Sequence, residues 1–467
     1  MSFAGVNIPG FEGVGRIGLY CQTANNQIEF MPASLHSLVN KLIKVKPHEI
    51  PAAVVSFLFI FTLMAAYYVL RPVRDAMSSD WTDAELSWLW TLNFFISAGA
   101  VLLYGLVVSR VRLRKLVPGI YIFFATSFLL FYLATHWYED TAFIDKSFYV
   151  WVSFFALFHV SVFWSFMSDI YSSGQSRRLF GLFGAGASIG AILGPSIPVF
   201  LGDRLGVYNL LLIAALMLLL IVPLIFYLDK IRSRNPGEAA NSFEPATLQI
   251  IGGKFFNGFI DFFSHRFLLG IGLFILLYTM MSSFVYFELK NVMVEYDRAT
   301  RSQYWGMMDL IVNTLAIFTA LFATSRLATK FGMAVTLALV PVILIFGWIA
   351  VAIAPGLALL IGLQITRRAG NYAITRPGRE MLFTGVERET RFKTKPVIDI
   401  VVYRGGDVLA GWTYTALAQG VGLGLGAIAV VAAMFACLWT LVAIFLGSSY
   451  EKNDRRQRAA REALMET

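Results

Sequence analysis

The amino-acid sequence predicts an all-α polytopic membrane protein with twelve transmembrane helices, arranged as two six-helix bundles related by pseudo-symmetry. Hydrophobic residues make up 57% of the 467 residues. Charged residues make up only 14%, whereas a soluble domain carries about 25%. Apolar segments of about 20 residues recur along the chain, which is the length that crosses roughly 30 Å of hydrocarbon. A long polar stretch near the middle divides these segments into two sets of six.

The apolar segments define the expected spans and the domains. The spans are expected near 51–71, 86–108, 116–135, 147–170, 178–201, 206–228, 267–289, 303–325, 332–353, 356–376, 397–418 and 424–447. The expected domains are a cytoplasmic N-terminal segment (1–48), a first bundle (49–228), a cytoplasmic linker with an interfacial helix (229–266), a second bundle (267–447) and a cytoplasmic basic tail (448–467). We interpret residues 1–30 as either disordered or not translated.

Charges in the connecting loops predict the orientation of the chain. Alternate loops are rich in arginine and lysine, as between Arg110 and Lys115 and between Arg388 and Lys395. The opposite set of loops is poor in cations, as in 136–145. Because cationic loops stay in the cytoplasm, both termini are expected there, in a bacterial inner membrane. The net charge of +9 therefore indicates topology and contacts with membrane lipids, and no nucleic-acid partner is expected.

The sequence offers no pattern typical of an enzyme. It contains no H-E-x-x-H motif, no Walker A loop and no Cys/His spacing typical of a metal site. Its two cysteines, Cys21 and Cys437, cannot form a disulfide framework. We therefore expect no enzymatic activity, no cofactor and no metal, in a protein that works as a monomer on a small-molecule substrate.

Charged residues end the first apolar segment. Arg71 and Arg74 are three positions apart and share a helix face, and Asp75 lies four positions from Arg71 and can pair with it. A charge near the membrane centre costs roughly 2.5–3.5 kcal/mol on insertion scales, so such residues face a water-filled cavity or a partner. Two interpretations follow: an anion-binding group inside a cavity, or the end of a span among the lipid headgroups.

A weak internal repeat relates the two halves. Ser109 aligns with Ser325, an offset of 216 (325 − 109), and at this offset Arg74 aligns with Lys290. The repeat predicts that Arg74 and Lys290 face one cavity from the two bundles, as a polyanionic substrate requires. Two related bundles around a site at the membrane midplane are typical of alternating access.

The same offset pairs polar residues of the second and eighth segments. Asn93 aligns with Asp309, and Ser97 aligns with Asn313. We interpret Asn93, Ser97 and Asn313 as residues that form hydrogen bonds between helices. Asp309 is costlier to bury, so it is expected to pair with a cation or to titrate.

Further candidates lie in the tenth and eleventh segments. Arg367 and Arg368 are adjacent, and adjacent helical residues point about 100° apart, so one is expected to bind substrate and the other to pair with a carboxylate. Arg404 and Asp407 are three apart and form either part of the site or a structural ion pair. The candidate substrate-binding residues are Arg71, Arg74, Lys290, Arg367, Arg368 and Arg404, and the candidate coupling or gating residues are Asp75, Asp309 and Asp407.

Glycines of the fifth segment predict a close helix contact. Gly186, Gly190 and Gly194 recur every four residues and would let a neighbouring helix approach and slide, which is typical of a moving interface.

Three stretches resemble the major facilitator superfamily, and within it the nucleotide-exchange branch of bacterial and plastid ATP/ADP translocases. They are YYVLRPVRDAM (67–77), FWSFMSDIYSSGQSRRLFGLFGAGASIGAILGP (163–195) and RPGREMLFTGVERETRFKTKPVIDIVVYRGGD (376–407). The resemblance implies a cavity lined by the first, fourth, seventh and tenth helices, and hence by Arg74, His159, Lys290 and either Arg367 or Arg368. It also carries the Lys-Asp pair of these translocases over to Arg74-Asp75, with arginine in place of lysine.

We therefore expect a secondary active transporter that moves an organic anion, nucleotide-like or otherwise phosphorylated, by antiport or symport. One alternative is a flippase for a lipid or lipid-linked anion on the same fold, which requires a lateral opening between the bundles. Another is a membrane sensor or scaffold without transport, whose function would tolerate Arg74→Ala and Arg367→Ala.

Overall fold

The computed structural model describes residues 45–108, 113–234, 262–322, 324–383 and 397–465, together with residues 386, 390 and 394. Nearly all of these residues are helical. The expectations for residues 1–30 and for most of the N-terminal segment and linker, including the interfacial helix, lie outside the described residues.

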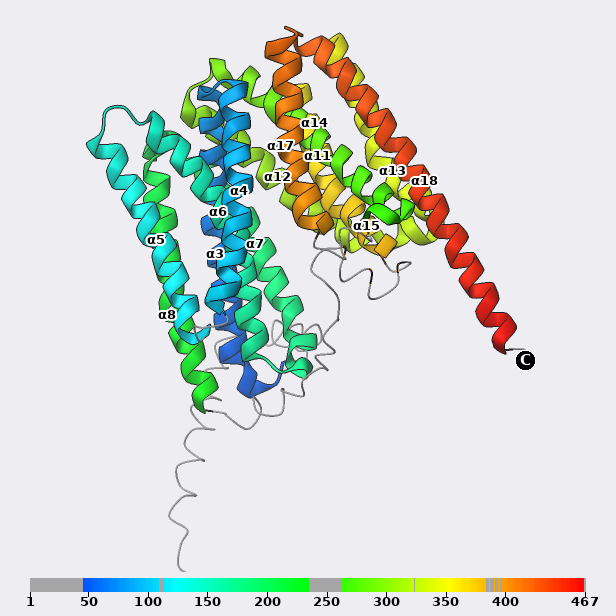
Figure 1. Ribbon diagram of the computed structural model, residues 1–467. Helices are drawn as coiled ribbons and strands as arrows, with labels where there is room; N and C mark the ends of the chain where they lie inside the picture. Colours follow the sequence, from blue (N-terminus) through cyan, green and yellow to red (C-terminus); the bar gives the residue numbers. More distant parts are fainter. Residues whose placement is uncertain are drawn as a thin grey trace, which may run out of the picture.

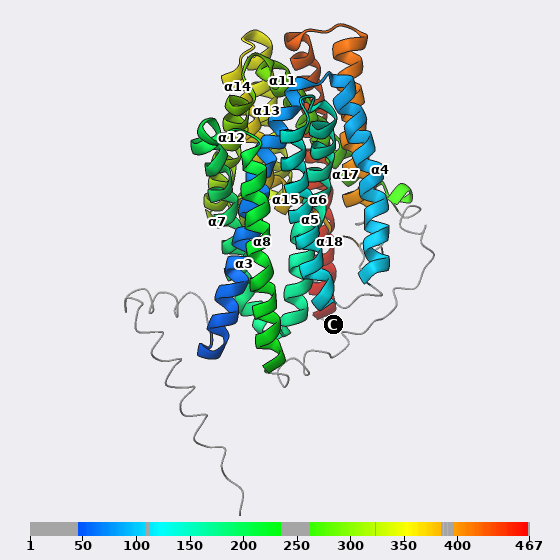
Figure 2. The same cartoon turned by 90° about the vertical axis from the view of Figure 1, so that its left-hand side faces the viewer.

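The first half of the chain forms one helical bundle. Its helices are α3 (Ile50–Met77), α4 (Asp83–Val108), α5 (Leu113–Trp137), α6 (Ala142–Ile170), α7 (Ser173–Leu205) and α8 (Asn209–Arg234). Helix α3 lies at the centre, because it packs against α6, α7 and α8. Helices α5 and α8 pack against each other on the outer side of this bundle, which faces the viewer in Figure 2.

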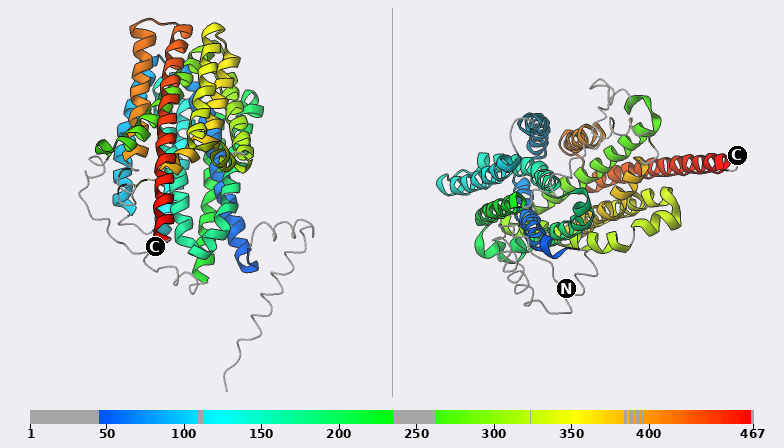
Figure 3. Two further views of the ribbon diagram at one scale, coloured as in Figure 1. Left: turned by 90° about the vertical axis from the view of Figure 1, so that its right-hand side faces the viewer. Right: turned by 90° about the horizontal axis from the view of Figure 1, so that it is seen from below.

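The second half forms another bundle in which two helical rods are interrupted by π-helical turns. Its α-helices are α11 (Arg266–Val292), α12 (Arg298–Phe322), α13 (Thr324–Ile353), α14 (Leu357–Gly370), α15 (Arg376–Leu382), α17 (Tyr403–Thr415) and α18 (Leu425–Met465). The π-helical turn η4 (Asn371–Thr375) joins α14 to α15, and η6 (Val397–Val402) and η7 (Ala416–Gly420) flank α17. Helix α18 extends past the rest of the bundle, as the view from below shows (Figure 3).

Eight of the described helices are long and apolar enough to cross a membrane by length and composition. Helices α4, α12, α14 and α17 are not among the eight. Helices α14 and α17 are too short, with 14 and 13 residues, because π-helical turns interrupt their rods, and α12 carries the buried charge of Asp309. Each predicted span nevertheless corresponds to a helical rod, six in each half of the described chain.

The turn after the first helix of each bundle reveals the internal repeat. Helix α3 runs into the 3-10 turn η2 (Ser78–Asp80) and the extended residue Trp81, and α11 runs into η3 (Met293–Glu295) and the extended residue Tyr296. These extended residues are 215 positions apart (296 − 81), one fewer than the offset expected from the sequence. Because one residue turns a helix face by about 100°, this difference changes which side chains are equivalent.

The two bundles meet at one end of the molecule and diverge toward the other (Figure 1). We call the end with η2 and η3 the far end, and the end with the start of α3 and the end of α18 the terminal end. The bundles touch where α12 packs against α3 and α7, and where α17 packs against α4.

Glycines of α7 bring it against α3 within the first bundle. A Cβ atom on Gly190 would lie 2.3 Å from the carbonyl oxygen of Phe61, and one on Gly194 would lie 2.6 Å from that of Ala65. The expected close approach is confirmed, but these glycines do not lie at the boundary between the bundles. There, Gly306 of α12 faces Pro195 of α7 instead.

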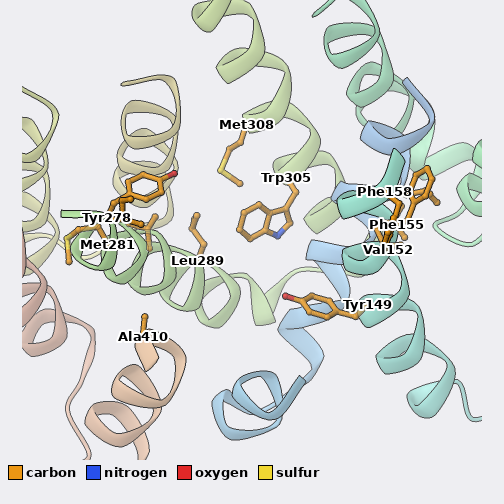
Figure 4. Packing of buried hydrophobic residues seen from close by; sticks show 14 of the residues in the cluster. Tyr149, Val152, Phe155, Phe158, Tyr278, Met281, Leu289, Trp305, Met308 and Ala410 are labelled. Atoms are coloured by element: carbon orange, nitrogen blue, oxygen red, sulfur yellow. The ribbon is translucent and has the colours of Figure 1, made fainter. Parts of the chain in front are cut away.

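The buried apolar residues form one continuous cluster through both bundles. Figure 4 shows Trp305 of α12 between Leu289 of α11 and Tyr149 of α6. Aromatic packing between the bundles closes the far end of the molecule, since the Trp90 ring of α4 lies 5.7 Å from that of Tyr286 and 5.2 Å from that of Phe287, both of α11.

Candidate functional site

A cavity of about 880 Å³ lies between the two bundles. Toward the far end, Trp90, Tyr149, Tyr286 and Trp305 line it. Toward the terminal end, the lining reaches Arg376, which is exposed to solvent. The cavity is therefore closed at the far end and reaches solvent at the terminal end. A volume of this size lies within the range of about 300–1,000 Å³ typical of small-molecule sites.

Arg74 on the wall of the first bundle is neutralised by its neighbour. Its Nε and Nη2 atoms donate to Asp75 Oδ1 at 2.9 and 2.6 Å, and Nη1 donates to Ser153 Oγ at 3.3 Å. The same Asp75 oxygen accepts a hydrogen bond of 3.1 Å from the Tyr286 hydroxyl of the second bundle. Asp75 therefore both neutralises Arg74 and joins the two bundles.

Arg71 belongs to an ionic cluster that spans the boundary between the bundles. Its Nη1 atom lies 3.4 Å from Asp309 Oδ1, and its Nε atom lies 3.7 Å from Asp75 Oδ2. Arg368 Nη1 lies 2.5 Å from the same Asp309 oxygen. Asp309, only 2% exposed, is thus paired with two arginines from opposite bundles. Of these three residues, Arg71 lines the cavity, and Asp309 and Arg368 lie behind it.

Arg367 lines the cavity from the second bundle and has only neutral partners. Its Nε and Nη2 atoms donate to Gln364 Oε1 at 3.2 and 2.7 Å, and Nη1 donates to the Tyr278 hydroxyl at 3.3 Å. Its guanidinium also lies over the Tyr278 ring, 5.7 Å from the centroid. The side chain is 3% exposed and forms no ion pair with any described residue. It is a buried positive charge with no carboxylate within ion-pair distance in the described part of the chain.

Arg404 and Asp407 also line the cavity, nearer the terminal end. Their closest charged atoms are 4.0 Å apart, and both side chains are partly exposed. Both residues therefore remain accessible to a ligand in the cavity.

The structure does not bring Lys290 to the cavity, in contrast to the expectation. Lys290 is 1% exposed, lies 2.8 Å from Asp83 Oδ1 and donates to the Trp81 carbonyl at 2.7 Å, at the far end. At the observed offset of 215, Lys290 is equivalent to Asp75 rather than to Arg74. Unlike Asp75, it does not line the cavity, because its ammonium group pairs with Asp83 of α4.

Further ion pairs across the bundles close the far end. Arg298 of α12 lies 2.6 Å from Asp80 and 2.8 Å from Asp145, and Arg301 lies 2.6 Å from Asp80. These residues were not predicted from the sequence. A signal was present, because Arg298 and Arg301 are cations in the set of loops that is otherwise poor in cations.

The interpretation of the polar residues on the second and eighth spans holds for only one of the three. Asn313 does join helices: its Nδ2 atom donates to the Ala191 carbonyl at 2.8 Å, and its Oδ1 atom accepts from the Tyr68 hydroxyl at 3.3 Å. Asn93 and Ser97 instead line the cavity. Asn93 Oδ1 and Ser97 Oγ have no hydrogen-bond partner among the described residues.

Another predicted member of the lining, His159, is buried in aromatic packing. Its ring lies 4.5 Å from that of Tyr67 and 5.1 Å from that of Phe155. Its Nδ1 atom is 3.0 Å from the Ala156 carbonyl. It does not contribute to the cavity lining.

Among the described residues, no group of three or more His, Cys, Asp or Glu side chains could hold a metal ion. The buried aspartates near the cavity, Asp75 and Asp309, contact arginines instead. The arginines and polar side chains of the cavity wall are suited to bind charged and hydrogen-bonding groups of a ligand.

At the terminal end, outside the spans, Glu49 ties α3 to α7. Its carboxylate accepts hydrogen bonds from Arg178 Nη1 at 2.9 Å and Nη2 at 2.8 Å, and from the Lys46 amide at 3.0 Å. Burial raises the pKa of Glu49, but these hydrogen bonds, together with the one from Gln175, outweigh burial and lower its pKa to about 2.

Comparison with known proteins identifies the fold. The sequence profile described as "Major Facilitator Superfamily" matches residues 54–375. No curated protein matches the chain. Solved structures do match. A bacterial homolog of the human lysosomal transporter Spinster, in an inward-facing and unoccupied conformation, has a TM-score of 0.60 and 13% identity, with 88% of this chain and 99% of that chain covered.

Two further structures are similar to this chain. A POT family transporter in complex with 5-aminolevulinic acid has a TM-score of 0.58 and 10% identity, covering 86% of this chain and 96% of that chain. The xylose transporter XylE from E. coli, in an inward-open conformation, has a TM-score of 0.54 and 12% identity, covering 85% of this chain and 95% of that chain. At such identities, the likeness shows the fold and leaves the substrate open.

Proposed function

Since the chain belongs to the major facilitator superfamily and is therefore a multi-pass secondary transporter by its fold, we propose that its substrate is an organic anion. The main support is Arg367, a buried guanidinium in the cavity wall that has no carboxylate partner among the residues the structure describes. Burying a charge without a counter-charge is costly, so such residues mark sites where a ligand supplies the missing charge.

The balance of charge in the centre of the cavity supports the same substrate class. Four arginines (Arg71, Arg74, Arg367 and Arg368) stand against two aspartates (Asp75 and Asp309). The excess is two positive charges, since Arg404 and Asp407 balance each other. An anionic group of one or two charges would neutralise this excess.

In this proposal the candidate residues take different roles. Arg367, Arg71 and Arg404 contact the anion, and Arg74 joins them when Asp75 releases it. Arg368 acts from behind, by holding Asp309. Lys290 acts in the closure of the far end, through Asp83. Asp75, Asp309 and Asp407 serve gating or coupling.

We further propose transport by alternating access. Asp80, Asp83 and Asp145 of the first bundle form ion pairs with the second bundle at the far end. These ion pairs hold the far end closed, and it would open when they separate. The loop charges predict that the terminal end is cytoplasmic, so this conformation would face the cytoplasm of a bacterial cell. Antiport and symport remain equally compatible with the cavity.

Phosphorylated solutes and carboxylates both fit this anion preference, because arginine binds either group with paired hydrogen bonds. The comparisons add no support for the narrower resemblance to nucleotide exchangers. The flippase alternative requires a lateral opening, and the contact between α4 and α17 argues against one in the far half. There, Ser87 lies 2.9 Å from Thr415, and Trp412 Nε1 donates to Thr91 at 3.0 Å.

Thermal unfolding of the purified protein in the presence of anions tests the proposal. The ligands are inorganic phosphate, hexose phosphates, carboxylates, nucleotides and lysophospholipids. A ligand that binds the native state raises its stability by RT ln(1 + [L]/Kd). We expect Arg367→Gln to weaken anion binding by about tenfold or more, because a hydrogen bond to a charged group contributes about 1.5–3 kcal/mol.

The stability of the ligand-free variant provides a second readout. Removing an unneutralised buried charge should leave the unfolding temperature unchanged or raise it, so that a lost anion response is not a folding defect. Arg456→Gln, at an exposed position of α18, is the matched control and should respond to anions as the wild type does. An anion response that survives Arg367→Gln, or no response of the wild type to any of these anions, contradicts the proposal.

A further inference from the structure

We propose that Asn93 and Ser97 form an uncharged subsite of the cavity that binds hydroxyl groups, so that the substrate is a hydroxylated organic anion. This inference rests on the proposed anion transport and narrows its substrate class. It assigns the charged part of the substrate to the arginines and a hydroxyl-bearing part to α4.

The two residues form one patch on α4. They are four positions apart and therefore lie one above the other on the same helix face. Both line the cavity, together with Phe94 and Ala98 from the same helix. Asn93 is 9% exposed and Ser97 is 6% exposed, so their polar atoms are withdrawn from bulk solvent.

One polar atom of each side chain lacks a partner among the described residues. Asn93 Oδ1 and Ser97 Oγ have no hydrogen-bond partner in the part of the chain that the structure describes. A buried polar group without a partner costs about 1–3 kcal/mol, so such groups are rare unless a ligand or water satisfies them. Their contrast with Asn313, which has two partners on other helices, shows that the fold can satisfy a buried asparagine where one is structural.

The chemistry of the two atoms selects the group that they bind. The carbonyl oxygen of Asn93 only accepts a hydrogen bond, and the hydroxyl of Ser97 both donates and accepts. A hydroxyl group can serve both, because it donates and accepts through one atom. An ammonium group could donate as well, but neither α4 residue offers the carboxylate that would neutralise it, and the cavity already carries excess positive charge.

Neighbouring donors are engaged elsewhere and do not compete for this role. Trp90, one turn earlier on α4, donates through Nε1 to the Tyr149 hydroxyl at 2.8 Å. Arg74 is held by Asp75 and Ser153. Asn93 and Ser97 are therefore uncharged polar groups of this wall that are available to a ligand.

Matched pairs of anions test the subsite. Glucose 6-phosphate and n-hexyl phosphate each carry a six-carbon unit on a phosphate, and gluconate and hexanoate form the corresponding carboxylate pair. Affinity is measured for the wild type, for Asn93→Ala/Ser97→Ala and for Arg367→Gln. In the wild type we expect the hydroxylated member of at least one pair to bind about tenfold more tightly, the effect of two hydrogen bonds.

The double variant should lose this preference and still bind the alkyl anion as the wild type does. It should also fold normally, since it removes two unsatisfied polar groups, and its unfolding temperature checks this. The proposal is overturned if the wild type prefers the hydroxylated member of neither pair, or if the double variant keeps the preference. In either case, binding of the alkyl anions that is weakened by Arg367→Gln would still support the proposed anion transport.

Discussion

The two walls of the cavity use buried arginines in opposite ways. In the first bundle, the guanidinium of Arg74 makes two short hydrogen bonds to the carboxylate of Asp75. In the second bundle, the guanidinium of Arg367 has an amide and a phenol as partners, Gln364 and Tyr278. Both arginines line the same cavity. Within the described ranges of the chain, only the second wall presents a buried guanidinium without a carboxylate partner.

The number of arginines in a span therefore does not identify the arginine that binds the ligand. A guanidinium paired with a carboxylate is nearly neutral to its surroundings, and an anion must displace the carboxylate to bind it. A guanidinium with neutral partners keeps its orientation and its charge. Arg367 therefore has the properties of a preformed anion site, and Arg74 those of a site that opens only when Asp75 moves.

Asp309→Asn should have the largest effect, because it removes the carboxylate that Arg71 and Arg368 share. Breaking a buried ion pair by removing one partner costs about 3–5 kcal/mol, so the unfolding temperature should fall markedly. Millimolar phosphate should restore part of the loss, since the first wall would then also carry an unneutralised charge. Glu139→Gln, at an exposed loop position, serves as the control. An unfolding temperature equal to that of the control would mean that the cluster contributes no stability.

Asp75→Asn should leave Arg74 without a carboxylate partner, so that the first wall of the cavity resembles the second. Asparagine can still accept the hydrogen bond from Tyr286, but it no longer neutralises Arg74. We expect phosphate to bind about tenfold more tightly to the variant, while the ligand-free protein loses about 1–3 kcal/mol of stability. Isothermal titration with phosphate measures the affinity. An affinity equal to that of the wild type would show that Arg74 does not reach the ligand, even when it is free.

Substitution of Glu49 should have the smallest effect on stability, and it serves as a reference because Glu49 and Arg178 form an ion pair outside the cavity. Its folded-state pKa of about 2 lies below the ordinary value of 4.5. Its contribution to stability is therefore complete above pH 4.5 and is lost as the pH falls toward 2. We expect Glu49→Gln to unfold at a lower temperature than the wild type at pH 7, by a smaller margin at pH 3, and at nearly the same temperature only below pH 2. Anion binding should not change, and a variant with altered phosphate affinity would contradict the separation of this pair from the cavity.

Local patterns in the chain predicted much of the fold. Runs of about 20 apolar residues can satisfy their backbone hydrogen bonds in a membrane only as helices, and each predicted span corresponds to a helical rod. The 100° rule for adjacent helical residues likewise predicted that Arg367 and Arg368 point apart. In the structure, Arg368 contacts Asp309 and Arg367 faces Tyr278.

Other features of the site could not be predicted, because they depend on small rotations and on partners that are distant in sequence. The internal repeat assigned Lys290 to the cavity, although the residue pairs with Asp83, a partner more than 200 positions away, at the far end. Asn93, Ser97 and Asn313 are similar residues in similar spans, and only their neighbours distinguish the one with helix-to-helix hydrogen bonds from the two without partners.

The sequence was sufficient to establish the class of protein and the charged residues that its spans contain. The length of an apolar segment and its composition are local properties that do not depend on how the helices pack. The assignment of partners required the tertiary structure. In the sequence, Asp75 and Asp309 could each pair with any nearby arginine. The packing of α3, α12 and α14 places Asp75 against Arg74 and Arg71, and places Asp309 against Arg71 and Arg368. Arg367 was left without a carboxylate by that geometry, since the energy of an ion pair depends on distances of a few ångströms that no linear pattern encodes.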